Sequence, residues 1–372
     1  MSIFIQIASY RDPELIHTLR SCISNATYPD NLNFCICWQR DETETLEEFT
    51  EDSRFIILDI PYNKSKGCCW ARNQIQKNYK NQDYTLQLDS HHRFVQGWDT
   101  LLIDMYKKLV NKGHAKPLIT AYVPSYDPAN DPAARVNYPW RIELSRITHE
   151  GHILFIPGHI EKWETLTEPV PADFYSAHFA FTTGQFCKEV RHNPELYFTG
   201  EEMNITIRAF THGYDLFHPH ILIAWHEYTR KYRTKHWDEC KDWNMLEQLS
   251  KLTYKRFIKN VLNDEMYDLA YGIGKRPIRE YSRYDLIVES MFPVKKVKHF
   301  FDKKFDVPQY ENLQFMFFGL HDIDGTELYR KDLVNSEKIL ELKVELASTP
   351  HKYTWLPYFK GSGWGDKIET NL

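Results

Sequence analysis

Asp89, Ser90 and His91 come directly after a short apolar run, residues 84–88. Such a run predicts a buried strand, and side chains two positions apart on an extended chain point the same way. Asp89 and His91 should therefore stand together at the end of that strand. One carboxylate and one imidazole suit Mn²⁺ or another divalent first-row ion better than a structural zinc, which recruits thiolates. The same tripeptide also fits a strand end followed by an ordinary polar loop.

A further histidine follows an apolar run in the same manner. Residues 221–225 are apolar, His226 comes next, and a loop rich in basic and aromatic residues follows. His226 could complete a metal site with the Asp-Ser-His segment, and Arg230, Lys231 and Arg233 of the loop could neutralise a diphosphate. Because the chain holds 17 histidines, a strand-end histidine that only makes a hydrogen bond is the alternative.

Two carboxylates, Glu201 and Glu202, follow Gly200 and open an amphipathic helix. Acidic side chains in a first helical turn interact favourably with the helix dipole, which accounts for one of the two. Two together at a loop-to-helix junction could also accept hydrogen bonds from sugar hydroxyls. The residues alone leave both interpretations open.

These residues need a scaffold, and the first ninety residues predict one. Apolar runs predict strands at residues 3–8, 32–38, 55–60 and 84–89, and periodic patterns predict helices at residues 14–24, 43–49 and 69–78. Apolar strands that alternate with helices indicate an α/β fold with a mostly parallel sheet, covered by helices on both faces. In such sheets ligands bind beyond the carboxyl ends of the strands. The segments Tyr10 to Asp12, Trp38 to Arg40 and Asp89 to His91 should therefore face one crevice.

Composition excludes some classes of function. A net charge of −5 and a pI near 6.4, without a dominant basic patch, argue against nucleic-acid binding. The seven cysteines lack zinc-site spacing and lie mostly in apolar runs, which predicts reduced thiols and a cytoplasmic protein, with attachment to a membrane surface left open. A strand from residue 3 argues against a signal peptide, and no apolar stretch approaches the ~20 residues of a membrane span. The sequence does not indicate an oligomeric state.

The motifs occur in an order that resembles GT-A glycosyltransferases. In chain order they are Lys66 to Asn73, Asp89 to His91, Gly97-Trp98, Gly200 to Glu202 and His226. The mucin-type polypeptide N-acetylgalactosaminyltransferases carry such an Asp-x-His motif, a Gly-Gly-Glu-Asn segment and a later histidine ligand. The chain more closely resembles the cytoplasmic N-acetylglucosaminyltransferases that modify hydroxyproline on a ubiquitin-ligase adaptor, together with their bacterial relatives. That likeness covers roughly residues 1–290 and rests also on residues 8–13, 37–39 and 226–230.

The resemblance implies a fold and an activity. The fold is a Rossmann-like GT-A domain. The activity is transfer of a sugar, with GlcNAc expected first, from a UDP-sugar to a hydroxyl of a glycan or protein, with retention at the anomeric carbon. Mn²⁺ or another divalent cation would offset charge on the departing UDP. If the acceptor attacks from the leaving-group side, no enzyme nucleophile is required, and positioning and electrostatics carry catalysis.

The resemblance also implies roles for single residues. The metal ligands would be Asp89, His91 and His226, and the catalytic set would be Asp89, His91, Glu201 and Glu202, with one glutamate or the other holding sugar hydroxyls. Donor contacts would come from Tyr10, Arg11 and Gln39 at the uridine, from Gly67, Arg72 and Asp89 near the ribose and phosphates, from Thr183 and Gly184 beneath the sugar, and from Arg230.

The chain departs from the mucin-type pattern. Residues 200–203 read Gly-Glu-Glu-Met, so the choice between GlcNAc and GalNAc is not carried over. Arg230 is one position further from His226 than the corresponding basic residue of those enzymes. Neither their membrane anchor nor their lectin domain is recognisable, which leaves capsule, lipopolysaccharide or protein as acceptors.

Other interpretations stay open. A retaining transferase could use UDP-GalNAc, UDP-Gal or UDP-Glc. A protein that binds UDP-sugars or glycans could keep the same residues without turnover. A metallohydrolase could use the same Asp and His residues, although the sequence offers no His-Glu-x-x-His helix.

The C-terminal part predicts a separate unit. Short alternating runs from about residue 307 predict a small β-sandwich-like module at residues 306–372, after a catalytic domain at 1–265 and a helical linker at 266–305. The module would brace the catalytic domain. Alternatively, Trp355, Tyr358 and Trp364 could bind an acceptor or a partner.

Overall fold

The computed structural model describes residues 1–148, 150–231, 233–263, 265, 270–291, 299–334, 337–346 and 348–372. These residues form two compact units. The first unit comprises residues 1–144, 155–228 and 233–284, and the second comprises residues 145–154, 229–232 and 285–372.

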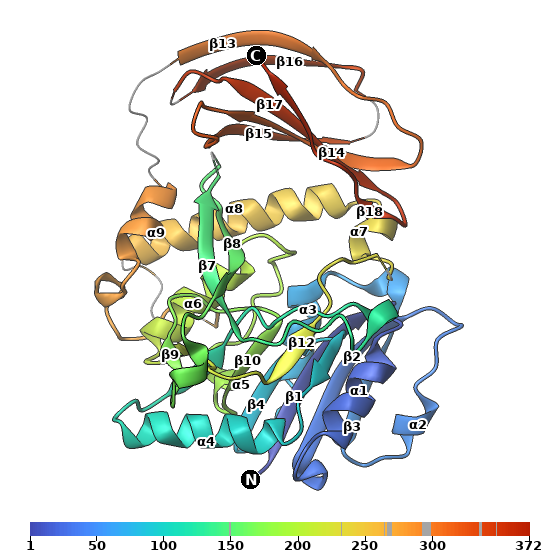
Figure 1. Cartoon of the computed structure of the whole chain (residues 1–372), viewed down its shortest axis with the longest axis vertical. Helices are drawn as coiled ribbons and strands as arrows, with labels where there is room; N and C mark the ends of the chain where they lie inside the picture. The colour runs from blue at the N-terminus through green and yellow to red at the C-terminus, as the bar shows by residue number, and fades with distance from the viewer. Residues whose placement is uncertain are drawn as a thin grey trace. The chain divides into compact units, whose positions relative to one another are not determined.

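The first unit is built on an eight-stranded sheet with the order β3-β2-β1-β4-β10-β6-β11-β9 (Figure 1). Its strands are β1 (Ile3–Tyr10), β2 (Leu32–Arg40), β3 (Phe55–Pro61), β4 (Tyr84–Asp89), β6 (Pro117–Thr120), β9 (Val170–Pro171), β10 (Phe179–Thr183) and β11 (Asp215–His218). β1 pairs in parallel with β2 and β4, β2 pairs in parallel with β3, and β10 runs antiparallel to both β4 and β6. The expected α/β fold with a mostly parallel sheet is confirmed.

Helices cover both faces of this sheet, which explains why its strands are apolar almost throughout. They are α1 (Leu15–Ser24) and α4 (Trp98–Asn111) on one face, and α3 (Cys68–Gln76), α5 (Phe186–Glu189) and α6 (Glu201–Thr211) on the other. Within β1, Ile3, Ile5 and Ile7 pack with α1 and α4, whereas Phe4 packs with α3. Burial of each such side chain stabilises the fold by about 1.5–3 kcal/mol.

Smaller elements complete the first unit. They are α2 (Glu47–Thr50), β5 (His92–Phe94), β12 (Ala224–His226), α7 (His236–Glu239), α8 (Trp243–Leu262) and η5 (Ile278–Glu280), with the hairpin strands β7 (Trp140–Ile147) and β8 (Ile153–His159) divided between the two units. The helix expected at residues 43–49 begins only at Glu47, because the Asp41 side chain accepts the Thr43 amide at 2.8 Å and holds a turn there. No helix in the described ranges is long and apolar enough to cross a membrane.

The second unit is rich in β-structure, as expected for the C-terminal module. Its strands are β13 (His299–Asp306), β14 (Leu313–His321), β15 (Glu327–Val334), β16 (Ile339–Leu346), β17 (Lys352–Phe359), β18 (Gly363–Trp364) and β19 (Ile368–Asn371), preceded by α9 (Tyr284–Met291). β13 pairs with β16, and the others form a five-stranded sheet. Residues 266–269 and 292–298 of the expected linker lie outside the described residues, and the domain boundaries stay a prediction.

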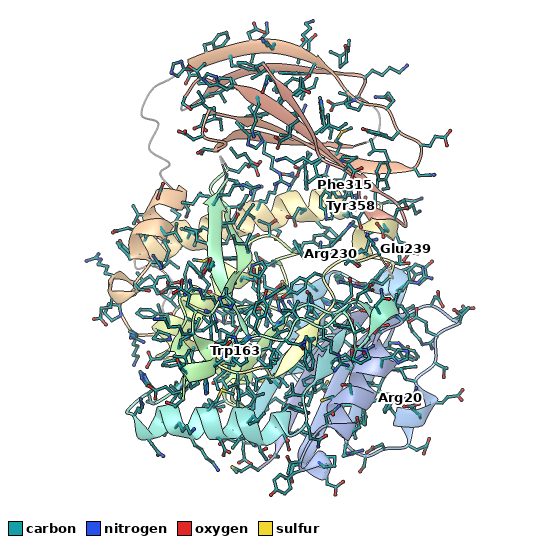
Figure 2. The ribbon with its side chains drawn as sticks, viewed as in Figure 1. Arg20, Trp163, Arg230, Glu239, Phe315 and Tyr358 are labelled. Atoms are coloured by element: carbon teal, nitrogen blue, oxygen red, sulfur yellow. The ribbon has the colours of Figure 1, made fainter. Side chains whose placement is uncertain are left out.

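Two of the three aromatic residues considered for ligand binding in this unit are buried. Trp355 belongs to the apolar core of the module. Tyr358 is wholly buried, and its ring stacks on Phe315 with centroids 4.7 Å apart (Figure 2). Trp364 remains 38% exposed. A surface role for Trp355 and Tyr358 is therefore wrong, because both side chains pack inside the protein.

Candidate metal and donor site

Asp89, His91 and His226 lie together at the carboxyl end of β4. Asp89 ends β4, the chain turns at Ser90, and β5 pairs with β12 so that His226 stands opposite His92. The Asp89 Oδ2 atom lies 3.4 Å from His226 Nε2 and 3.7 Å from His91 Nε2. One ligand atom from each residue lies within 4.8 Å of the other two. The local turn and the short β5–β12 ladder thus gather three metal-ligating side chains.

A buried carboxylate behind His91 orients its ring. Asp12 Oδ2 lies 2.7 Å from His91 Nδ1 and accepts the Ser90 hydroxyl at 2.6 Å. Burial raises the pKa of Asp12, but the His91 and Arg233 charges outweigh it, so the pKa lies below its usual range. An ionised acceptor places the imidazole proton on Nδ1 and leaves the Nε2 lone pair facing Asp89. The sequence placed Asp12 at the crevice, two residues beyond the end of β1, but gave it no role of its own.

Two histidines near Asp89, His178 and His226, are held in the neutral form by burial. Burial lowers the pKa of His226 well below its usual range, and it lowers the pKa of His178 to about 3. The rings of His178 and His226 stack with centroids 4.2 Å apart. A metal ion needs an unprotonated imidazole nitrogen, so burial keeps His226 ready to bind at neutral pH. Sequence reasoning missed His178.

Arg72 connects Asp89 to the glutamate pair. Its Nη2 atom donates to Asp89 Oδ1 at 2.6 Å, and its Nη1 atom donates to Glu201 Oε1. His192 Nε2 lies 3.0 Å from the same Glu201 oxygen. Burial raises the pKa of Glu201, but Arg72 and His192 outweigh it and hold the pKa at about 2. Burial likewise raises the pKa of Asp89, yet His226 and Arg72 bring it well below the usual range.

These ion pairs bear on two expectations. Arg72 and Glu201 are each 4% exposed, and both side chains brace Asp89. Contact of Arg72 with the ribose or phosphates, and of Glu201 with sugar hydroxyls, stays a prediction. A buried charge must be paired, and each of these two is the other's partner.

Glu202 has a different environment. It is half-buried, its Oε1 atom accepts the Ala177 amide at 3.0 Å, and its Oε2 atom accepts the Tyr122 hydroxyl at 3.1 Å. Burial, followed by the Glu201 charge, raises its pKa to about 7. The Tyr122 ring lies 5.0 Å from the ring of His178, which links Glu202 to the His226 side of the cluster.

Comparison with known proteins now decides the class. A family model described as glycosyltransferase (GlcNAc) matches residues 2–51 and 45–290. The chain belongs to this family of glycosyltransferases. The crystal structure of GalNAc-T7 with UDP, GalNAc and Mn²⁺ covers 100% of this chain and 72% of its own, with 13% identity and a TM-score of 0.53, and it shows that the GT-A fold is shared. Residues 1–349 of TarS from S. aureus cover 78% of this chain and 71% of their own, with 12% identity and a TM-score of 0.46. A search of curated proteins found no match.

In this glycosyltransferase the first two strand ends lie at the same edge of the sheet as Asp89. Tyr10 pairs in register with Gln39, and Ala8 pairs with Asp89. Tyr10 donates to Glu239 at 2.8 Å, and Arg11 pairs with both Asp41 and Glu239, which lies on α7 (Figure 2). The side chains of Tyr10 and Arg11 are partly exposed. They border the edge where a donor would bind.

Gln39 is buried and hydrogen-bonded within the protein, and its contact with the donor stays a prediction. Its Nε2 atom donates to Ser9 O at 3.0 Å, its Oε1 atom accepts the Ser65 hydroxyl at 2.5 Å, and the residue is 2% exposed. Gln39 therefore supports the loop before Gly67. Gly67 itself begins α3 with φ of +100°, and a Cβ atom there would lie 2.7 Å from the Tyr197 ring, so only glycine fits.

The expectation for Thr183 and Gly184 is wrong. Because β10 runs antiparallel to β4, Thr183 stands opposite Tyr84, at the far end of β4 from Asp89. Five residues of strand correspond to about 16 Å. The residues that reach the site edge are those just before β10, where His178 O accepts the Asp89 amide at 3.3 Å. The apolar pattern of β10 contains no signal for its direction.

The basic loop after His226 contributes Arg233 to the cluster. Arg233 Nη2 lies 3.1 Å from His91 Nε2, and its Nε atom lies 3.8 Å from carboxylate oxygens of both Asp12 and Glu227. Arg230 belongs to the second unit and has a φ of +58°. Its contact with a donor stays a prediction.

Proposed function

We propose that this glycosyltransferase moves a sugar, with GlcNAc as the first expectation, from a UDP-sugar to a hydroxyl of a glycan or protein. The transfer would depend on a divalent cation and retain the anomeric configuration. The observation that carries the proposal is the cluster of Asp89, His91 and His226 at the carboxyl edge of a GT-A sheet. The family description supports GlcNAc, and the Mn²⁺ and UDP in the GalNAc-T7 structure support the cation and the nucleotide.

The residues present fit a divalent cation. They offer one ionised carboxylate and two imidazoles, of which His226 is neutral and His91 turns its Nε2 lone pair toward Asp89. This mixed oxygen and nitrogen set suits Mn²⁺. A cation held there would supply positive charge to the diphosphate of the donor.

The other side chains would bind and orient the donor. Tyr10 and Arg11 would contact the uridine, and Arg233 and Arg230 would contact the diphosphate. Glu202 would accept a hydrogen bond from a sugar hydroxyl, since each of its oxygens accepts only one hydrogen bond that the structure shows. Arg72 and Glu201 would keep Asp89 in position from behind. With these contacts, the acceptor hydroxyl could attack from the side of the departing UDP and give its proton to a phosphate oxygen.

A cytoplasmic location is part of the same proposal. The structure has all seven cysteines as free thiols, and thiols persist in a reducing compartment.

The test is release of UDP from UDP-GlcNAc, UDP-GalNAc, UDP-Gal and UDP-Glc with Mn²⁺, with and without EDTA, followed by NMR of the product anomer. His226→Ala should abolish turnover while the fold is retained, and His17→Ala, which changes an exposed histidine on α1, should not. Turnover separates an enzyme from a binding protein, and calorimetry with UDP and Mn²⁺ separates both of these from a metallohydrolase. Full activity of a folded His226→Ala protein would remove that residue from the site, and failure to bind UDP would remove the whole proposal.

A further inference from the structure

Cys68 and Cys69 form a second cluster with Glu201, away from the three residues assigned to the first cation. The two sulfur atoms lie 3.9 Å apart, and Cys68 Sγ lies 3.7 Å from Glu201 Oε2. One ligand atom from each of the three residues lies within 4.8 Å of the other two. The proposed transfer uses neither thiol.

The spacing matches that of ligands around a small tetrahedral cation. With Zn–S bonds of about 2.3 Å, two sulfur ligands of a tetrahedral zinc ion lie about 3.8 Å apart. The carbonyl oxygen of Tyr197 lies 3.3 Å from Cys68 Sγ and offers one further oxygen atom beside that ligand. Two thiolates with one carboxylate favour a softer ion than the set of Asp89, His91 and His226.

The surroundings already hold Glu201 in the orientation that such a site needs. Its Oε1 atom contacts Arg72 and His192, so its Oε2 atom is the one that faces Cys68. Carboxylate ligands of metals are usually oriented by hydrogen bonds of this kind. Coordination would release two thiol protons to solvent as one divalent cation enters. The net charge of this buried region therefore would not change.

We propose that Cys68, Cys69 and Glu201 form a second metal site, specific for a zinc-like, thiophilic divalent cation. This site shares no ligand with the cluster of Asp89, His91 and His226, although Glu201 is linked to Asp89 through Arg72.

The test is a titration of the reduced, full-length protein with Cd²⁺, in which thiolate coordination is followed by its ultraviolet charge-transfer band. We expect one equivalent of Cd²⁺ per chain to produce the band, and Zn²⁺ to displace it. Cys68→Ser should lower the affinity for Cd²⁺ by more than about tenfold, as loss of a ligand must cost at least as much as loss of a supporting residue. Cys240→Ser is the matched control, because Cys240 is also a half-buried free cysteine.

Two further measurements test the number of thiolate ligands and the separation of this site from the first one. Since Cys69 is wholly buried and Cys69→Ser could fail to fold, cadmium NMR of the wild-type protein should report two thiolate ligands directly. His226→Ala should keep the band, which separates this site from the first one. Absence of the band in the wild type, an unchanged Cd²⁺ affinity in Cys68→Ser, loss of the band in Cys240→Ser, or a single thiolate ligand would each overturn the proposal.

Discussion

The two neighbouring glutamates at the start of α6 lie in different surroundings. Glu201 belongs to a first wall of the site, formed with Arg72, and Glu202 belongs to a second wall, formed with Tyr122. Glu201 is buried and has both a cation, Arg72, and a histidine, His192, against one of its oxygens. Glu202 is half-buried, and its partners are the Ala177 amide and the Tyr122 hydroxyl. Successive helical residues point about 100° apart, so one step along the chain changes the environment completely.

This difference indicates a structural role for Glu201 and a ligand-binding role for Glu202. The wall formed by Arg72 and Glu201 contains charges that are fully paired and closed to solvent, and it holds Asp89 in place. The wall formed by Glu202 and Tyr122 keeps lone pairs that a ligand could use. Burying a charge without a partner is costly, so we expect the first wall to contribute to the stability of the fold. We expect the second wall to contribute to ligand binding.

The largest effect should follow from removing the cation of the first wall. Arg72→Met leaves Glu201 buried without its partner, and breaking a buried pair costs about 3–5 kcal/mol of unfolding free energy. The matched control is Arg20→Met on α1, whose partner Glu48 is exposed, and such surface pairs contribute about 0–1 kcal/mol. Urea unfolding of both variants measures the contrast. Equal small losses would mean that the first wall does not stabilise the fold.

The second wall should respond in activity rather than in stability. Glu202→Gln removes a charged acceptor of a sugar hydroxyl, and hydrogen bonds to charged groups contribute about 1.5–3 kcal/mol, so kcat/KM should fall about 10- to 100-fold. Its Tm should stay close to that of the wild type. Glu195→Gln, at an exposed position, is the control. Unchanged kcat/KM in Glu202→Gln would place the sugar elsewhere.

The sequence predicts the scaffold and the grouping of Asp89, His91 and His226 well, because both depend on local pattern. Apolar runs bounded by polar residues are enough to find β1, β2, β3 and β4, and parallel pairing brings the carboxyl ends of such strands to one edge. Asp89 and His91 follow directly from the end of β4. His226 likewise follows an apolar run, and a short antiparallel ladder to β5 brings it to Asp89.

The remaining site residues depend on contacts between distant segments, which no local pattern contains. Nothing in the residues near Glu201 shows that Arg72, 129 positions away, meets it. The direction of β10 decides which of its ends reaches the site, and both directions give the same apolar run. Asp12 and His178 act through the neighbours that they contact, so their residue type alone did not single them out.

Asp12 offers a finer test of how the ligands themselves are held. Asp12→Asn keeps the shape but weakens the acceptor at His91 Nδ1, and loss of such a supporting residue lowers metal affinity about 10- to 100-fold. Mn²⁺ binding measured by electron paramagnetic resonance gives the affinity without turnover. Asp30→Asn, at an exposed position, is the control. Unchanged affinity in a folded Asp12→Asn protein would show that the hydrogen bond does not orient the ligand.

The smallest effect is a difference in pH dependence between the two glutamates. Burial raises the pKa of Glu202 to about 7, above its ordinary value of 4.5, so its contribution to stability is present below pH 4.5 and is lost as pH rises through about 7. The pKa of Glu201 is held at about 2, so its contribution changes only below pH 4.5.

Unfolding free energies at pH 5 and pH 8 should show this contrast. The stability of the wild type relative to Glu202→Gln should decrease from pH 5 to pH 8. Its stability relative to Glu201→Gln should change less over that interval, because only the part of the Glu202 pKa shift that the Glu201 charge causes enters that comparison. Titrating groups that interact with neither glutamate cancel in both comparisons. A constant difference for Glu202→Gln would mean that Glu202 titrates as an ordinary exposed carboxyl, and the two walls would then not differ in the way that their contacts indicate.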